Sequence, residues 1–187
     1  MSKQVSLLKR GISYIVDLYS GSLIGTLPIS LMTYVQLGKM TQNAFLLEKF
    51  TACLIMTISM ILLIFYYVVI PTKILKGQTL GKRLMDIHVL YNEESSLLKR
   101  QIIYMIFMTS FGTLIGQFLS VLTGYQIMQI VNDITMSVSL VIVATIIFTK
   151  DHMGLYDRLA NTKVQDIKKE VWLKLEFKEK NYGSFYG

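Results

Sequence analysis

The sequence predicts an all-α integral membrane protein in which four transmembrane helices form two parallel hairpin repeats, with both termini and small strand-like segments in the cytosol. Of its 187 residues, 52% are hydrophobic and 17% are charged, whereas about 25% of the residues in a soluble domain are charged. The net charge of +7 would suggest a nucleic-acid partner in a soluble chain. Because the basic residues flank long apolar runs here, we expect a membrane protein and no nucleic acid.

Four apolar segments are each long enough to cross a bilayer, which takes about 20 residues in a helix. The first contains Asp17 and a kink expected at Pro28, and the second stops at Pro71, because proline lacks the N–H that a helix needs. The fourth is extended outward over Asn132 and Asp133, since the apolar core behind them is short. The expected spans are residues 12–35, 51–70, 101–122 and 128–149.

The distribution of basic residues predicts the orientation of these spans. Lysine and arginine residues number three before the first span, six between the second and third, and eight after the fourth, but two and none in the remaining loops. Because cytoplasmic segments carry the basic excess, we expect a multi-pass protein of the cell membrane with the N-terminus, central segment and C-terminus in the cytoplasm. Within these segments, residues 83–90 and 171–177 alternate apolar and polar residues, which predicts a small cytosolic β element or an interfacial segment.

Internal similarity predicts the two repeats. The tetrapeptide Leu-Leu-Lys-Arg at residues 7–10 recurs at residues 97–100, each time directly before a span. The membrane topology also requires basic residues at the cytoplasmic end of a span, so this match can arise without a repeat. A second match is not explained by the topology: each hairpin is followed by an Arg-Leu pair with a valine six residues after the arginine. These residues are Arg83 with Val89 and Arg158 with Val164. We infer two hairpins of the same orientation, residues 7–89 and 97–164.

Asp17 is the first candidate functional residue, because an ionisable side chain inside a span costs about 2.5–3.5 kcal/mol on insertion scales. A helical wheel places Arg10 and Ser13 on the same face, which we expect to meet a partner helix or a wet cavity. Arg10 lies about 10.5 Å away along the axis, so the two cannot pair within one helix. Two roles stay open for Asp17, namely binding of a proton or cation and a fixed salt bridge near the membrane surface.

Two further features are weighed in the same way. Asp133, beside Asn132, is a second candidate for ion or substrate binding, unless it lies in the extracellular headgroup zone. The stretch Gly-Gln-Thr-Leu-Gly-Lys-Arg at residues 77–83 has the wrong spacing for a phosphate loop. We expect a turn that presents Lys82 and Arg83 to anionic lipid headgroups or to an acidic partner, unless the two residues are ordinary cytoplasmic charge.

No arrangement of residues points to catalysis. The single cysteine, Cys53, and the two histidines, His88 and His152, have no metal-ligating neighbours at usable spacing. A serine or cysteine nucleophile with a partnering base is not recognisable either. We therefore expect a protein that is not an enzyme and that carries no cofactor or metal.

These residues resemble the RDD family of bacterial membrane proteins, which is named for one arginine and two aspartates. The resemblance begins with Lys9-Arg10 before the first span and Asp17 within it. It continues with Gly-Gln-Thr-Leu-Gly-Lys-Arg-Leu at residues 77–84 and ends with Gly-Leu-Tyr-Asp-Arg-Leu-Ala-Asn-Thr-Lys-Val at residues 154–164. The combination of these motifs in this order is specific.

The resemblance also sets the expected domain boundaries. It covers about residues 5–166, with Asp86 and Asn161 at two positions where the family usually has glycine. We expect an RDD-like membrane domain over residues 1–166 and a charged cytosolic tail over residues 167–187. The resemblance implies a polytopic membrane protein, and a transport role has been suggested for the family, with cation/proton exchange proposed for some members.

By the same resemblance, Arg10, Asp17 and Asp157 are the three residues of the family name and candidates for ion or substrate binding. We expect Arg10 or Arg83 to contact Asp157 and close the cytoplasmic side between the repeats. The first functional hypothesis is a small transporter or cation/proton exchanger that uses Asp17, and four spans would then require a homo-oligomer. The alternative is a non-enzymatic accessory or regulatory subunit that binds a partner membrane protein.

Overall fold

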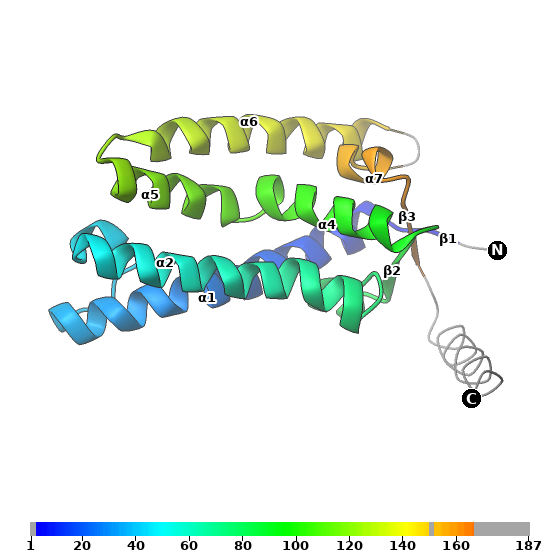
Figure 1. Ribbon diagram of the computed structural model, residues 1–187. Coiled ribbons are helices and arrows are strands. Elements are labelled where there is room, and N and C mark those ends of the chain that lie inside the picture. The colour runs from blue at the N-terminus through cyan, green and yellow to red at the C-terminus, as the bar shows by residue number, and fades with distance from the viewer. Residues whose placement is uncertain (1–2, 150–151, 167–187) are drawn as a thin grey trace.

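The computed structural model describes residues 3–149 and 152–166, so the strand-like segment expected at 171–177 and the tail at 167–187 lie outside the described residues. Long helices run side by side, with a small sheet at one end (Figure 1). One hairpin pairs α1 with α2, and the other pairs the bent α4 and α5 with α6. The helical elements are α1 (Leu7–Leu37), the 3-10 turn η1 (Ala44–Leu46), α2 (Lys49–Ile64), its π-helical continuation η2 (Phe65–Ile74), α3 (Leu80–Leu84), α4 (Glu94–Met108), α5 (Phe111–Thr123), α6 (Ile127–Phe148) and α7 (Leu155–Leu159).

Three continuous helices are long and apolar enough to cross a membrane. α6 agrees with the expected fourth span to within one residue at each end, and α1 runs through Pro28 as one helix. The expected end of the second span at Pro71 is wrong, because the wider turn of η2 accommodates the missing N–H and closes with Leu75 N donating to Ile70 O at 2.8 Å. The three helices are Leu7–Leu37, Lys49–Ile74 and Ile127–Phe148.

The third expected span is a broken helix. α4 begins seven residues earlier than expected, and a break at residues 109–110 separates it from α5, which is bent away by 65°. The Thr109 hydroxyl donates to Met105 O at 2.5 Å and accepts a hydrogen bond from Phe111 N at 3.2 Å, so side-chain bonds replace the backbone ladder there. A continuous span over 101–122 is therefore wrong, and α4 with α5 makes a fourth span only as a bent pair.

A three-stranded antiparallel sheet joins three distant parts of the chain at one end of the helices (Figure 1). In this sheet Val89 lies opposite Val164, and these are the two valines that the internal repeat equates. Equivalent residues of two repeats pair in an antiparallel ladder when a two-fold axis passes between them. The register thus pairs two residues that the internal repeat equates. The strands are β1 (Lys3–Gln4), β3 (Lys163–Asp166) and β2 (Ile87–Leu90), in this spatial order.

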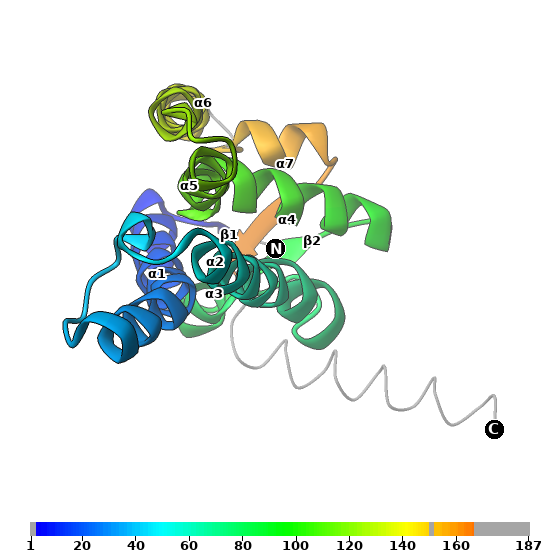
Figure 2. The same cartoon turned by 60° about the vertical axis from the view of Figure 1, so that its left-hand side comes forward.

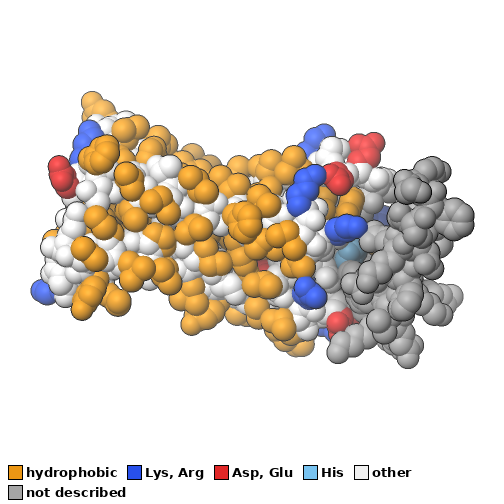
Figure 3. Space-filling view, turned by 60° about the horizontal axis from the view of Figure 1, so that its bottom comes forward, with side chains coloured by type: hydrophobic (Ala, Val, Ile, Leu, Met, Phe, Trp, Pro, Cys, Tyr) orange, Lys and Arg blue, Asp and Glu red, His pale blue; other side chains and the backbone are white. Residues whose placement is uncertain are grey.

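The surface of the helical part suits hydrocarbon. Apolar side chains cover the face seen in Figure 3, whereas charged side chains gather towards its ends. Figure 2 shows α6 at the periphery with α5 between it and α2. In the apolar stretch of α6 that is long enough to span a membrane, only 6% of the residues are buried inside the protein. The core lies where the two hairpins meet, around Leu63, Tyr67 and Tyr104. A helical protein that exposes this much apolar surface along its spans is a multi-pass membrane protein.

Candidate functional site

Asp17 is fully buried on the inner face of α1. Its carboxylate accepts hydrogen bonds from Thr79 Oγ1 and from the backbone N–H of Gly81, the latter at 2.8 Å. Both donors belong to the start of α3, because Thr79 is the N-cap of that helix. The stretch that resembles a phosphate loop at first sight thus surrounds an internal carboxylate. Asp17 is held by hydrogen bonds from the start of α3.

The close approach of α3 to α1 depends on glycine at position 81. A Cβ there would lie 2.1 Å from Ser13 O and 3.0 Å from Asp17 Cγ, closer than packed atoms can come. This docking buries the Lys82 side chain and leaves Arg83 exposed. The expectation that both basic residues face lipid headgroups is therefore wrong for Lys82.

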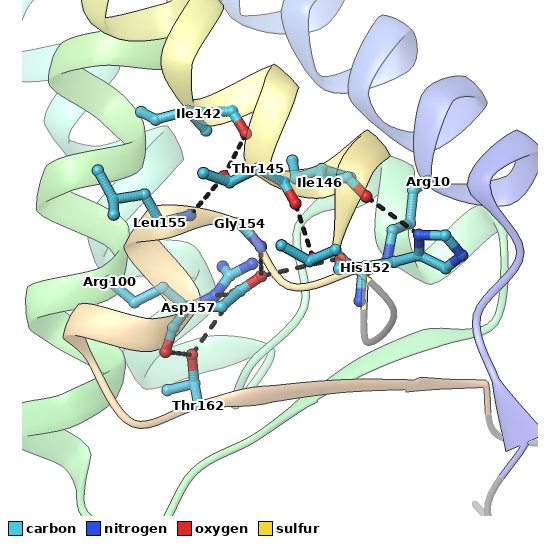
Figure 4. A network of polar contacts seen from close by, with 11 residues as sticks. Arg10, Arg100, Ile142, Thr145, Ile146, His152, Gly154, Leu155, Asp157 and Thr162 are labelled. Atoms are coloured by element: carbon cyan, nitrogen blue, oxygen red, sulfur yellow. Dashed lines mark hydrogen bonds and ion pairs between the residues drawn. The ribbon is translucent and has the colours of Figure 1, made fainter.

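Asp157, in α7, is the second buried carboxylate, and it receives arginines from both repeats (Figure 4). Arg100 Nε donates to its Oδ1 at 2.7 Å, and Arg10 Nη1 lies 3.8 Å from its Oδ2. The N–H of Gly154 donates to the same Oδ2 at 3.2 Å. The expected contact between Arg10 and Asp157 is therefore confirmed. The alternative contact through Arg83 is wrong, because that side chain is exposed on α3 while Asp157 has no exposed surface.

Arg100 is the member of the site that sequence reasoning missed. Hydropathy places it in the basic flank before the third span, but α4 starts earlier and carries the side chain inward, where it is 1% exposed. Its guanidinium carbon lies 4.9 Å from the centre of the Tyr156 ring. A signal for this role exists in the sequence, because the repeat equates Arg100 with Arg10, and both arginines approach the same carboxylate.

Lys82 is a buried cation whose Nζ lies 5.1 Å from the centre of the Tyr104 ring, within the range of a cation–π interaction. Burial, followed by the positive charge of Arg100, lowers the pKa of Lys82 to about 7, and the two aspartates oppose this shift. Several nitrogens of the cluster make no hydrogen bond within the described part of the chain. They are Nζ of Lys82, Nε of Arg10 and Nη1 of Arg100.

Two cavities lie in succession along α1. The first has a volume of about 40 Å³ and is lined by Arg10, Asp17 and Lys82, among others. The second, of about 200 Å³, lies between α1, α2 and α5 and has a mixed polar and apolar lining. Tyr67 lies between the two, because its hydroxyl donates to Asp17 O at 2.8 Å and fills the space over Gly21. The polar residues of the second cavity are Ser22, Thr26, Gln42, Ser110, Thr113 and Gln117.

Asp133 does not join this site. It is exposed on α6, six residues after the start of that helix and next to the turn from α5, which is the end of the bundle opposite the sheet. A wide cavity of about 660 Å³ opens at that end, between η1 and the α5–α6 turn. Within residues 3–149 and 152–166, no three His, Cys, Asp or Glu residues are grouped so that they could hold a metal ion.

The comparison with protein families gives one match, and it covers the whole buried cluster. The model of the RDD family matches residues 5–161, which include Arg10, Asp17, Lys82, Arg100 and Asp157. Comparison with the curated proteins and with the solved structures finds no match. A match over most of the 187 residues, together with the resemblance of the motifs that build the site, assigns the chain: it belongs to the RDD family.

Proposed function

We propose that the chain is a small transporter of the cell membrane. The observation that carries the proposal is the succession of two cavities along α1 on either side of Tyr67 and Gly21. Asp17 and Ser22 border the two cavities and are about 7.5 Å apart along the helix. One aromatic contact thus separates two spaces that a small solute can occupy in turn.

The break between α4 and α5 also supports a transport role. Ser110, at the break, lines the larger cavity. Irregular backbone at membrane depth is tolerated where it lines a cavity, and discontinuous helices beside a binding site recur in transporters. The basic residues favour a cytoplasmic sheet end, so in this proposal both described termini are inside and the smaller cavity is the inner one.

Asp17 is the residue whose charge changes in the proposed cycle. As a carboxylate it accepts two hydrogen bonds from the start of α3. A proton or a cation bound to it weakens those bonds, which allows α3 to move away from α1 and open the inner cavity. Cation/proton exchange fits this arrangement, because one carboxylate serves both ligands in turn. Arg10 and Asp157 then keep the second repeat closed at the same end.

The test is ion flux in proteoliposomes that contain the purified protein and an imposed proton gradient. Na⁺, K⁺ or Li⁺ is added in turn as the gluconate salt, and dissipation of the gradient is followed with a pH-sensitive dye. We expect cation-dependent dissipation by the wild type and its loss in Asp17→Asn. Asp133→Asn is the matched control, since it makes the same chemical change on an exposed carboxylate.

Retention of flux by folded Asp17→Asn, or loss of flux in both variants, would contradict the assigned role of Asp17. Folding is checked by a monodisperse elution profile and an unchanged helix content in detergent. Absence of any cation-dependent signal from the wild type would argue against exchange. That result would favour the second candidate function, a regulatory or accessory subunit.

The second candidate function is a regulatory or accessory subunit, and α6 favours it. Gln129, Asp133 and Ser137 are exposed at helical spacing on this peripheral helix, and Asp133 lies about 9 Å along the axis from the start of α6. A carboxylate inside a span is costly unless a partner covers it. A second copy is distinguished from another membrane protein by disulfide cross-linking of Ser137→Cys in a Cys53→Ser background, which joins two chains only if α6 faces its own copy.

A further inference from the structure

The buried cluster carries more positive than negative charge. Three cations and two carboxylates lie within it; four of these side chains are buried, and that of Arg10 is 12% exposed. Taking charges out of water is costly unless each is paired. With all groups ionised, the cluster therefore has one formal positive charge in excess. The cations are Arg10, Lys82 and Arg100, and the carboxylates are Asp17 and Asp157.

The pairing geometry shows which cation is left over. Asp157 is occupied by Arg100 at 2.7 Å and by Arg10 at 3.8 Å. The two oxygens of Asp17 are occupied by Thr79 Oγ1 and the N–H of Gly81. Nζ of Lys82 is buried and makes no hydrogen bond within the described ranges, so the excess charge resides there.

A cavity of about 40 Å³ is lined by Lys82 and Arg10, and Nε of Arg10 also makes no hydrogen bond within the described part of the chain. A water molecule needs about 10–15 Å³ of such space, so the cavity suits a particle no larger than a few waters. A polyatomic lipid headgroup does not fit. Two residues from separate elements, each with a buried nitrogen that makes no hydrogen bond in the described ranges, thus line a space of ionic size.

We propose that this cavity binds one small monovalent anion of halide size, held between Arg10 and Lys82. The anion neutralises the excess charge and accepts hydrogen bonds from the two unpaired nitrogens. Asp17 also lines the cavity, and its carboxylate repels an anion, so the site favours a monovalent over a divalent anion. Protonation of Asp17 removes this repulsion and therefore strengthens anion binding. The inference concerns a binding site and holds whether or not the protein transports solutes.

A neutral Lys82 with water in the cavity is the competing arrangement, and pH separates the two. The pKa of Lys82 is lowered to about 7, so the lysine is mostly charged at pH 6 and mostly neutral at pH 9. An anion requires the charged form, and its affinity therefore falls as the pH rises. The titratable groups that face Lys82 are Arg10 and Asp17 from α1, His88 from β2, Arg100 and Tyr104 from α4, and Asp157 from α7.

The test measures thermal unfolding of the purified protein in detergent at pH 6, with sodium chloride exchanged for sodium gluconate at constant ionic strength. A ligand that binds only the folded state raises the unfolding temperature with its concentration. We expect a saturable rise with chloride and a weaker one at pH 9. Lys82→Gln should lose at least tenfold in apparent chloride affinity, whereas Arg83→Gln, its exposed neighbour on α3, should respond as the wild type does.

Equal unfolding temperatures in chloride and gluconate, or a full chloride response in Lys82→Gln, would overturn the proposal. If Lys82→Gln does not fold, wild-type crystals soaked in sodium bromide decide the question by anomalous scattering. The expected result is a bromide peak between Arg10 and Lys82. Peaks confined to the surface of the protein would mean an adventitious ion only and would refute the site.

Discussion

Replacement of Gly81 by alanine tests the docking of α3 on α1. The new methyl group would lie 2.1 Å from Ser13 O and 3.0 Å from an oxygen of Asp17. Since the first of these atoms belongs to the backbone of a long helix, no side-chain rotation relieves the contact, and α3 must move. That movement separates the N–H of Gly81 from the carboxylate that it contacts at 2.8 Å.

The size of the effect follows from two costs and one gain. Overpacking costs about 1–3 kcal/mol, and loss of a hydrogen bond to a charged group costs about 1.5–3 kcal/mol. Alanine in place of glycine in a helix returns about 1 kcal/mol. The free energy of unfolding should therefore fall by about 1.5–5 kcal/mol, a large part of the total stability of a typical domain.

The assay is reversible unfolding of the purified protein in mixed micelles with increasing SDS. Gly11→Ala is the matched control, because Gly11 is also helical and a Cβ there meets nothing within 4 Å. The same helix preference then acts without the clash, so the control should be unchanged or stabilised by up to about 1 kcal/mol. Equal stabilities of the two variants would refute the described contact of α3 with α1.

Three further outcomes are expected. Arg100→Met should lower the free energy of unfolding by about 3–5 kcal/mol, because it leaves Asp157 buried without its 2.7 Å partner, whereas Lys99→Met on the exposed face of α4 should change it by less than about 0.5 kcal/mol. Between pH 7 and 9 the unfolded state binds more protons than the folded state at Lys82, whose pKa is lowered to about 7, so stability measured by thermal unfolding should rise with pH in this window and Lys82→Gln should remove the rise. Tyr67→Phe removes the 2.8 Å hydrogen bond to the α1 carbonyl, and it should cost about 0.5–1.5 kcal/mol in the SDS assay.

Hydropathy and charge predicted most of the membrane architecture. The fourth span matched α6 closely, because a long apolar run in which Asp133 is the one charged residue leaves few other places for a helix to end. The break at residues 109–110 was not predicted, because a hydrogen bond from the Thr109 hydroxyl to Met105 O does not change the hydropathy of the sequence. Pro71 led to the opposite error. A proline usually ends a helix, so a helix end was predicted there, but Pro71 lies within the π-helical η2.

The site was predictable only in part, for a reason that lies in packing. Asp17 and Asp157 could be recognised from charge in a span and from the family motifs. Whether Lys82 or Arg83 points inward depends on which side of the short α3 meets α1, and only the missing side chain of Gly81 decides that. Charge counting treats both basic residues alike, so it placed Lys82 at the membrane surface.

The position of β3 in the sheet has a consequence for the order of assembly during synthesis. β1 and β2 have no bonds to each other and meet only through β3, which leaves the ribosome after every membrane span has been made. Arg10 and Arg100 are likewise synthesised before Asp157, the carboxylate that both of them contact. Both hairpins therefore enter the bilayer while their shared end is still open, and closure is a late step. A chain interrupted before residue 157 lacks the carboxylate that both arginines contact, so the shared end of the two hairpins cannot close as it does in the complete cluster.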